Sequence, residues 1–77
     1  ALAKEVCSEI SSEIGIHDFR MVKGNTHTNL IFDVVVPFGF KLNDDEIRRE
    51  VNSRIRENDS NLFTVITIDK DYTDSHK

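Results

Sequence analysis

The feature that most constrains the fold is the apolar run from Thr28 to Val36. Its composition is typical of a strand, and its side chains alternate between the two faces of a sheet. One face carries four apolar side chains, and the opposite face carries two apolar side chains and an aspartate. The first set is Leu30, Phe32, Val34 and Val36, and the second is Ile31, Asp33 and Val35.

Two apolar stripes with a spacing of four residues predict two helices. The first runs from Leu2 to Ile14 and is expected to end at Gly15, which favours a left-handed C-terminal cap. The second begins after Asn43, which forms a capping box with Glu46, and continues to about residue 57.

Two further segments, 16–22 and 62–68, are rich in β-branched and large apolar residues and predict strands. Residues 23–26 predict the turn of a hairpin, because Gly24 and Asn25 tolerate positive φ. The order is therefore αββαβ, an α+β two-layer sandwich. The fold is expected to span residues 1–77 as a single domain, with its core at about 3–70 and a polar tail at 71–77.

Two helices can cover only one face of a three-stranded sheet. Ile31, Val35 and Val65 would then be exposed on the other face unless a partner covers them. A chain of 77 residues supplies only about 3–5 kcal/mol from its core, so oligomerisation is a natural source of further stability. These three residues are the predicted interface of a homodimer.

Composition excludes several functions. The net charge of −4 argues against a nucleic-acid partner, and Arg48, Arg49, Arg54 and Arg56 are diluted by acidic neighbours on the second helix. Cys7 has no cysteine partner and is interpreted as a buried, inert thiol. The sequence has no nucleophile–base pattern, phosphate loop or metalloprotease motif, so neither an enzyme nor a small-molecule substrate is expected.

Three segments resemble the C-terminal domain of cation diffusion facilitators, which are integral-membrane exporters of divalent metal ions. Ile16-His17-Asp18-Phe19-Arg20 is similar to the Ile-His-Asp-Leu-Arg segment that opens the first strand in that family. Residues 30–36, with Asp33 at the centre, are similar to its second strand. Residues 66–71 resemble its last strand, which typically reads Thr-Ile-His-x-Glu or Thr-Ile-His-x-Asp.

The resemblance implies a ferredoxin-like, metallochaperone-like fold in the cytoplasm, below a transmembrane domain in the same polypeptide. The whole protein would lie in an inner or plasma membrane and export zinc, manganese or a similar ion. Family members pair as homodimers through this domain, and in several of them a bound metal draws the protomers together. The expected function is therefore a cytosolic dimerisation and regulatory domain of a metal exporter.

The family's metal ligands transfer to this chain only in part. His17 matches the first-strand histidine, and Asp71 matches the final carboxylate. Asp69 replaces the histidine of the last strand, and Val35 stands where a second-strand histidine is common. The histidine of the second helix corresponds to Arg48, or to Ile47 if the alignment shifts by one.

The resemblance thus leaves His17, Asp69 and Asp71 as a partial metal site. Zinc prefers imidazole and thiolate ligands, whereas this oxygen-rich set suits manganese better, with water completing the shell. The domain would bind one of these ions, shared between two copies, or it would form a dimer that needs no cofactor. His17 could instead hydrogen-bond a backbone carbonyl or Asp18. His27 is interpreted as a solvated turn residue and His76 as part of the polar tail.

The main alternative is a free-standing ferredoxin-like regulatory domain that binds a ligand, because a fold does not fix a function. The chain begins at Ala1 without an initiator methionine, which favours a segment of a longer protein. Hydrophobic spans encoded ahead of Ala1 would favour the transporter.

Overall fold

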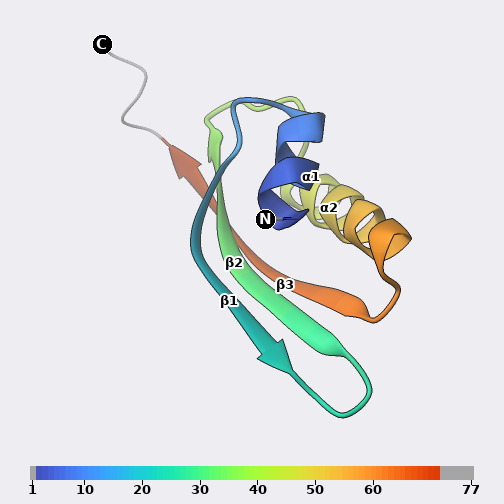
Figure 1. Ribbon diagram of the computed structural model, residues 1–77. Helices are drawn as coiled ribbons and strands as arrows, with labels where there is room; N and C mark the ends of the chain where they lie inside the picture. Colours follow the sequence, from blue (N-terminus) through green and yellow to red (C-terminus); the bar gives the residue numbers. More distant parts are fainter. Residues whose placement is uncertain (1, 72–77) are drawn as a thin grey trace.

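The computed structural model describes residues 2–71, which form a three-stranded sheet with two helices on one side (Figure 1). The order αββαβ and the α+β two-layer architecture agree with the sequence prediction. The elements are α1 (Leu2–Ile10), β1 (Gly15–Lys23), β2 (Thr28–Pro37), α2 (Asp44–Asn58) and β3 (Leu62–Asp71).

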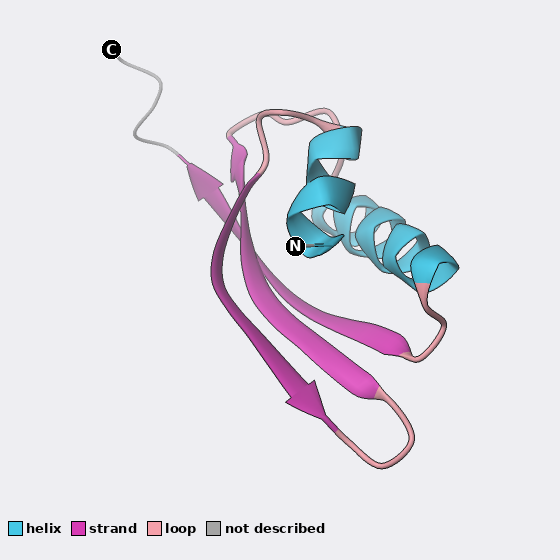
Figure 2. Ribbon diagram, in the orientation of Figure 1, coloured by secondary structure: helices cyan, strands magenta, loops and turns pink. Residues whose placement is uncertain are grey.

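The sheet is mixed and has the order β1-β2-β3. β1 and β2 form an antiparallel hairpin, whereas β2 and β3 are parallel and are joined by the crossover through α2. Both helices lie against the same face of the sheet (Figure 2). The strongest predicted strand, β2, therefore occupies the centre, where both of its edges are paired.

The core lies between the helices and the face of β2 that carries Leu30, Phe32, Val34 and Val36, each at most 2% exposed. The stripe residues of both helices meet this face, and β3 adds one side chain. These further core residues are Ala3, Val6, Cys7, Ile47, Val51, Ile55 and Ile66. Cys7 is buried, as its position beside the apolar stripe predicts.

The first helix is shorter than predicted, because α1 ends at Ile10 rather than Ile14. The Ser11 hydroxyl accepts a hydrogen bond from the amide of Glu13, and such local side-chain bonds compete with the helical pattern. Ile14 still packs against the core from the connecting segment. The prediction that Gly15 caps the helix is therefore wrong. Gly15 is the first residue of β1.

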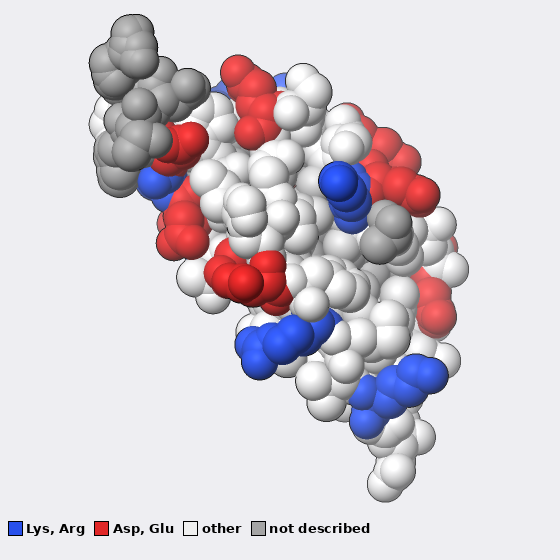
Figure 3. Space-filling view, turned by 60° about the vertical axis from the view of Figure 1, so that its left-hand side comes forward, with Lys and Arg blue, Asp and Glu red and all other residues white. Residues whose placement is uncertain are grey.

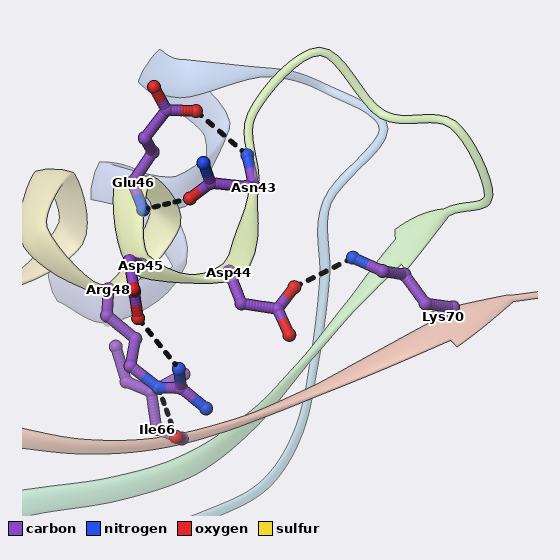
Figure 4. A network of polar contacts seen from close by, with 7 residues as sticks. All are labelled: Asn43, Asp44, Asp45, Glu46, Arg48, Ile66 and Lys70. Carbon is purple, nitrogen blue, oxygen red and sulfur yellow. Dashed lines mark hydrogen bonds and ion pairs between the residues drawn. The ribbon is translucent and has the colours of Figure 1, made fainter.

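The second helix begins where the sequence predicts. Asn43 accepts a hydrogen bond from the amide of Glu46 at 2.8 Å, and Glu46 accepts one from the amide of Asn43 at 2.9 Å (Figure 4). The two bonds satisfy amide groups that the helix itself leaves without a partner. The helix is then anchored to β3 by an ion pair between Asp44 and Lys70 at 2.7 Å.

The third strand continues to Asp71, beyond the predicted end at Ile68. Its pairing with β2 extends through Val35↔Asp69 to Pro37↔Asp71. Asp71, the first residue of the predicted polar tail, therefore belongs to β3, and residues 72–77 lie outside the described part of the chain. Within residues 2–71, neither helix is long and apolar enough to cross a membrane.

β1 contains a bulge that the sequence analysis did not anticipate. His17 pairs with Asp33 and Arg20 pairs with Ile31, so Asp18 and Phe19 together oppose a single residue of β2. Asp18 has a φ of 55°, a left-handed conformation that aspartate tolerates better than most residues. The extra residue places Phe19 on the helix side, where its ring stacks on Phe32 at 5.9 Å. It also returns Arg20 to the opposite side of the sheet.

Candidate functional site on the open sheet face

The candidate site lies on the side of the sheet that faces away from the helices, which we call the open face. Strand register assigns its residues, because paired residues of adjacent strands share a face. From the Pro37 end to the hairpin end, the rows are Pro37–Asp71, Gly15–Val35–Asp69, His17–Asp33–Thr67, Arg20–Ile31–Val65 and Val22–Asn29–Phe63.

The three apolar residues predicted to form a dimer interface all lie on the open face. Ile31 and Val35 are half-buried by their neighbours, and Val65 is 51% exposed. Ile31 and Val65 are adjacent in one row, and Val35 lies two positions further along β2. Their location agrees with the prediction, whereas their contact with a second copy remains a prediction.

The predicted metal ligands share this face but do not form one cluster. His17 lies on β1 and Asp69 on β3, so β2 separates them by two strand spacings, about 9–10 Å. Asp69 and Asp71 are two residues apart on β3 and point to the same side, as their alternation with Lys70 predicts. Within residues 2–71, no three histidine, cysteine or carboxylate side chains are close enough to hold a metal ion.

His17 and Asp71 do line a common surface pocket of about 340 Å³, together with Glu13. Val35 and Pro37 form apolar parts of its wall. A Cβ atom at Gly15 would lie 3.8 Å from Nε2 of His17, an ordinary van der Waals contact, so the imidazole does not require a glycine at this position. The lining of the pocket therefore includes one imidazole and two carboxylates.

The aspartate at the centre of the open face has a perturbed pKa. Partial desolvation raises the pKa of Asp33, and protonated Asp33 donates a hydrogen bond to Asp18, which raises it further. The negative charges of Asp18 and Asp69 act in the same direction, while His17 opposes them. The open face thus concentrates negative charge around Asp33.

Sequence reasoning did not identify Asp18, Asp33 or Arg20 as site residues. Of the three, Asp33 could most readily have been identified from the sequence, because it is the sole charged residue in the apolar run of β2. The face on which Asp18 and Arg20 lie depends on the bulge, which shifts the alternation of β1 by one residue. An ideal strand would have placed Arg20 on the helix side.

Of the three positions that the resemblance aligns with further histidines, two lie on α2, away from the open face. Arg48 is on α2, where its Nε donates to the carbonyl of Ile66 at 3.3 Å and its guanidinium pairs with Asp45 at 3.6 Å (Figure 4). Ile47 is buried in the core. Val35 is therefore the one of these three positions that lies on the open face.

Of the other two histidines, the structure describes His27 alone. His27 is exposed at the hairpin, as predicted, but its ring also packs on the edge of Phe63 at 4.7 Å. Its Nδ1 is 3.1 Å from the hydroxyl of Thr26. The guanidinium of Arg56 lies 4.4 Å from the centroid of the same ring, so Phe63 contacts two side chains. His76 lies outside the described residues.

Comparison of the chain with protein-family models, curated proteins and solved structures gave no significant match.

Proposed function

We propose that the chain is the cytosolic dimerisation and regulatory domain of a cation diffusion facilitator, an exporter of divalent metal ions from the cytoplasm. One observation carries the proposal. The three segments that resemble this family form the three neighbouring strands of one sheet, and the helices leave one face of that sheet uncovered. That face combines apolar side chains with an imidazole and several carboxylates.

Self-association is the part of the function that the open face favours most directly. Val65 exposes half of its surface beside Ile31, so water contacts apolar atoms that a second copy would cover. A small domain also gains stability from association, since its own core is limited. The proposed partner is therefore a second copy of this chain, held below the membrane by the same polypeptide.

Metal binding enters the proposal in a restricted form. His17, Asp69 and Asp71 belong to one face, but a single protomer brings no three such groups of residues 2–71 within reach of one ion. A complete ligand set would therefore require groups from a second protomer or from outside these residues. The proposed dimer does not depend on an ion for its formation.

The dimer is tested by sedimentation velocity over a range of protein concentrations. We expect concentration-dependent dimerisation of the chain and its loss in Val65→Asp, because the new charge would be buried in the interface. Met21→Asp is the matched control, since Met21 is 54% exposed but pairs with Leu30 on the helix side of β1. A chain that stays monomeric at millimolar concentration would refute the proposed self-association.

Metal binding is tested by titration calorimetry with zinc and with manganese. If the open face binds an ion, His17→Ala and Asp71→Ala should each reduce the heat of binding, and the stoichiometry should be below one ion per chain when two copies share it. Unchanged binding in both variants and in Asp69→Ala would exclude these residues as ligands.

The transporter assignment is tested on the gene itself. Hydrophobic spans encoded ahead of Ala1 would support it, and a gene that encodes these residues alone would favour a free-standing regulatory domain. For the full-length protein in sealed vesicles, removal of residues 2–71 should lower metal transport without abolishing it, because the transported ion is expected to bind among the membrane helices.

A further inference from the structure

Among residues 2–71, the open face carries one arginine, Arg20, for which no partner is present. Arg20 pairs with Ile31 across the hairpin, and its side chain is exposed. Within residues 2–71, its guanidinium forms no ion pair and no hydrogen bond. By contrast, Arg48 and Arg54 of α2 both have carboxylate partners.

Within residues 2–71, no basic side chain forms an ion pair with Asp18, Asp33 or Asp69 on the same face. Asp33 lies two residues beyond Ile31 on β2, about 7 Å away along the strand. Asp18 contacts Asp33 from the bulge, and Asp69 adds a third negative charge. Asp18, Arg20, Ile31 and Asp33 line one surface pocket of about 530 Å³. In Figure 3 a group of acidic side chains lies beside basic ones that are nearer the hairpin end.

A patch of this kind is complementary to itself. In a two-fold symmetric dimer every contact between two different residues occurs twice. If residue i of one protomer contacts residue j of its partner, then residue j of the first protomer contacts residue i of the partner. We propose that two copies pair through their open faces so that Arg20 of each protomer binds the Asp18–Asp33 pair of the other. This inference rests on the proposed function for the existence of the dimer, and it adds the groups that fix its orientation.

The spacing of the sheet permits this pairing. Two sheets pack about 10 Å apart, and neighbouring strands lie about 4.8 Å apart. A two-fold axis that lies in the interface and passes near Ile31 and Asp33 would set the row of Arg20 opposite the row of Asp33. The long arginine side chain spans the remaining lateral distance of one strand. Its guanidinium can bind a carboxylate through two parallel hydrogen bonds.

A second copy is favoured over an unrelated partner because the patch supplies both halves of the charge pair. Each contact would occur twice, and Ile31 and Val65, which share the row of Arg20, would be covered beside the two charged contacts. Electrostatic complementarity of this kind selects one orientation among the many in which apolar faces can stack.

Exchange of charges between two variants provides the test. We expect Arg20→Glu to weaken the dimer by about tenfold, because attraction becomes repulsion at two symmetric contacts. Asp33→Arg should weaken it by a similar factor for the same reason. An equimolar mixture of the two variants should recover the affinity of the original chain to within about threefold, since both cross-contacts then join opposite charges.

The mixture distinguishes a loss of pairing from a loss of folding. If a variant failed to associate because it was misfolded, mixing it with the other variant would not restore association. Sedimentation velocity with one variant fluorescently labelled at its N-terminus measures the mixed dimer, and circular dichroism checks that each variant is folded. Arg49→Glu makes the same charge change on the exposed side of α2 and should leave the dimer unchanged.

The outcomes distinguish this inference from the proposed function. If Val65→Asp disrupts the dimer but Arg20→Glu leaves its affinity unchanged, as Arg49→Glu should, the charge pairing is overturned. The dimer through the open faces would then still stand. Failure of the mixture to associate, when each variant is folded, would also overturn the charge pairing. Absence of any dimer in the original chain would remove the proposed self-association, and this inference with it.

Discussion

Lys70 near the end of β3 donates to the carboxylate of Asp44, the first residue of α2, over a distance of 2.7 Å. The bond links residues 26 positions apart and holds the side chain of Lys70 on the helix side of the sheet (Figure 4). Because side chains alternate along a strand, Asp69 and Asp71 are directed to the open face. The ion pair therefore lies on the face opposite to the acidic end of the candidate site.

The coupling between Lys70 and Asp44 can be measured with a double-mutant cycle. Lys70→Ala and Asp44→Ala should show an interaction free energy of about 0.5–1 kcal/mol in urea unfolding, since both side chains are partly exposed. The same cycle on Arg54 and Glu50, a more exposed helical pair, should give about 0.3–0.5 kcal/mol. Coupling that does not fall when salt is raised would contradict an ionic origin.

The capping box of α2 predicts a graded effect at Asn43. Asn43→Ala should lower the free energy of unfolding by about 1 kcal/mol, because the amide of Glu46 loses its acceptor. Asn43→Ser should retain most of the stability, since its hydroxyl oxygen can accept the same bond. Thermal unfolding followed by circular dichroism measures both, and equal losses in the two variants would show that the cap contributes little.

The raised pKa of Asp33 predicts how stability varies with pH. A carboxyl group with a higher pKa in the folded state binds its proton more tightly there, so its contribution favours folding at low pH. That contribution is lost as the pH rises from the ordinary aspartate value, about 3.9, through the raised value. Asp33→Asn should therefore unfold less readily than the original chain at pH 7, and the difference should shrink below about pH 4.

The measurement for Asp33 is urea unfolding between pH 3 and pH 7, at concentrations too low for association. Glu57→Gln, which removes a carboxylate from the exposed end of α2, provides the control and should give a difference that varies less with pH. An Asp33→Asn variant that is less stable at pH 7 would show that the carboxylate is stabilised by its surroundings instead.

Burial raises the pKa of Cys7 to about 11, which predicts an unreactive thiol. A disulfide reagent at pH 8 should modify the folded chain only as fast as the chain opens, because the thiolate is the reacting form. Cys7→Ser should cost more stability than Cys7→Ala, since it buries a hydroxyl group within an apolar cluster. Rapid labelling of the folded chain would contradict the buried position.

The thiol also affects stability at alkaline pH. Its pKa is higher in the folded chain than in the unfolded chain, so the stability that it contributes is present below about pH 8.5. That part is lost as the pH rises toward 11. Cys7→Ala removes the titrating group and should flatten this part of the stability curve.

The order of the elements can be predicted from local patterns in the amino-acid sequence. The alternation of Thr28–Val36 predicts a strand with one fully apolar face, and Asn43 with Glu46 predicts the start of α2. The uncovered sheet face also follows from the sequence, since two single-stripe helices cannot cover both sides. These features require no knowledge of contacts between distant residues.

Tertiary structure alone decided how the charged side chains are distributed on that face. The bulge at Asp18 shifts the alternation of β1, and this shift brings Arg20 beside Ile31 and Asp18 against Asp33. Strand order places β2 between His17 and Asp69, which separates two of the predicted ligands. Local periodicity cannot contain this information, because the positions depend on how strands pair and where one of them gains an extra residue.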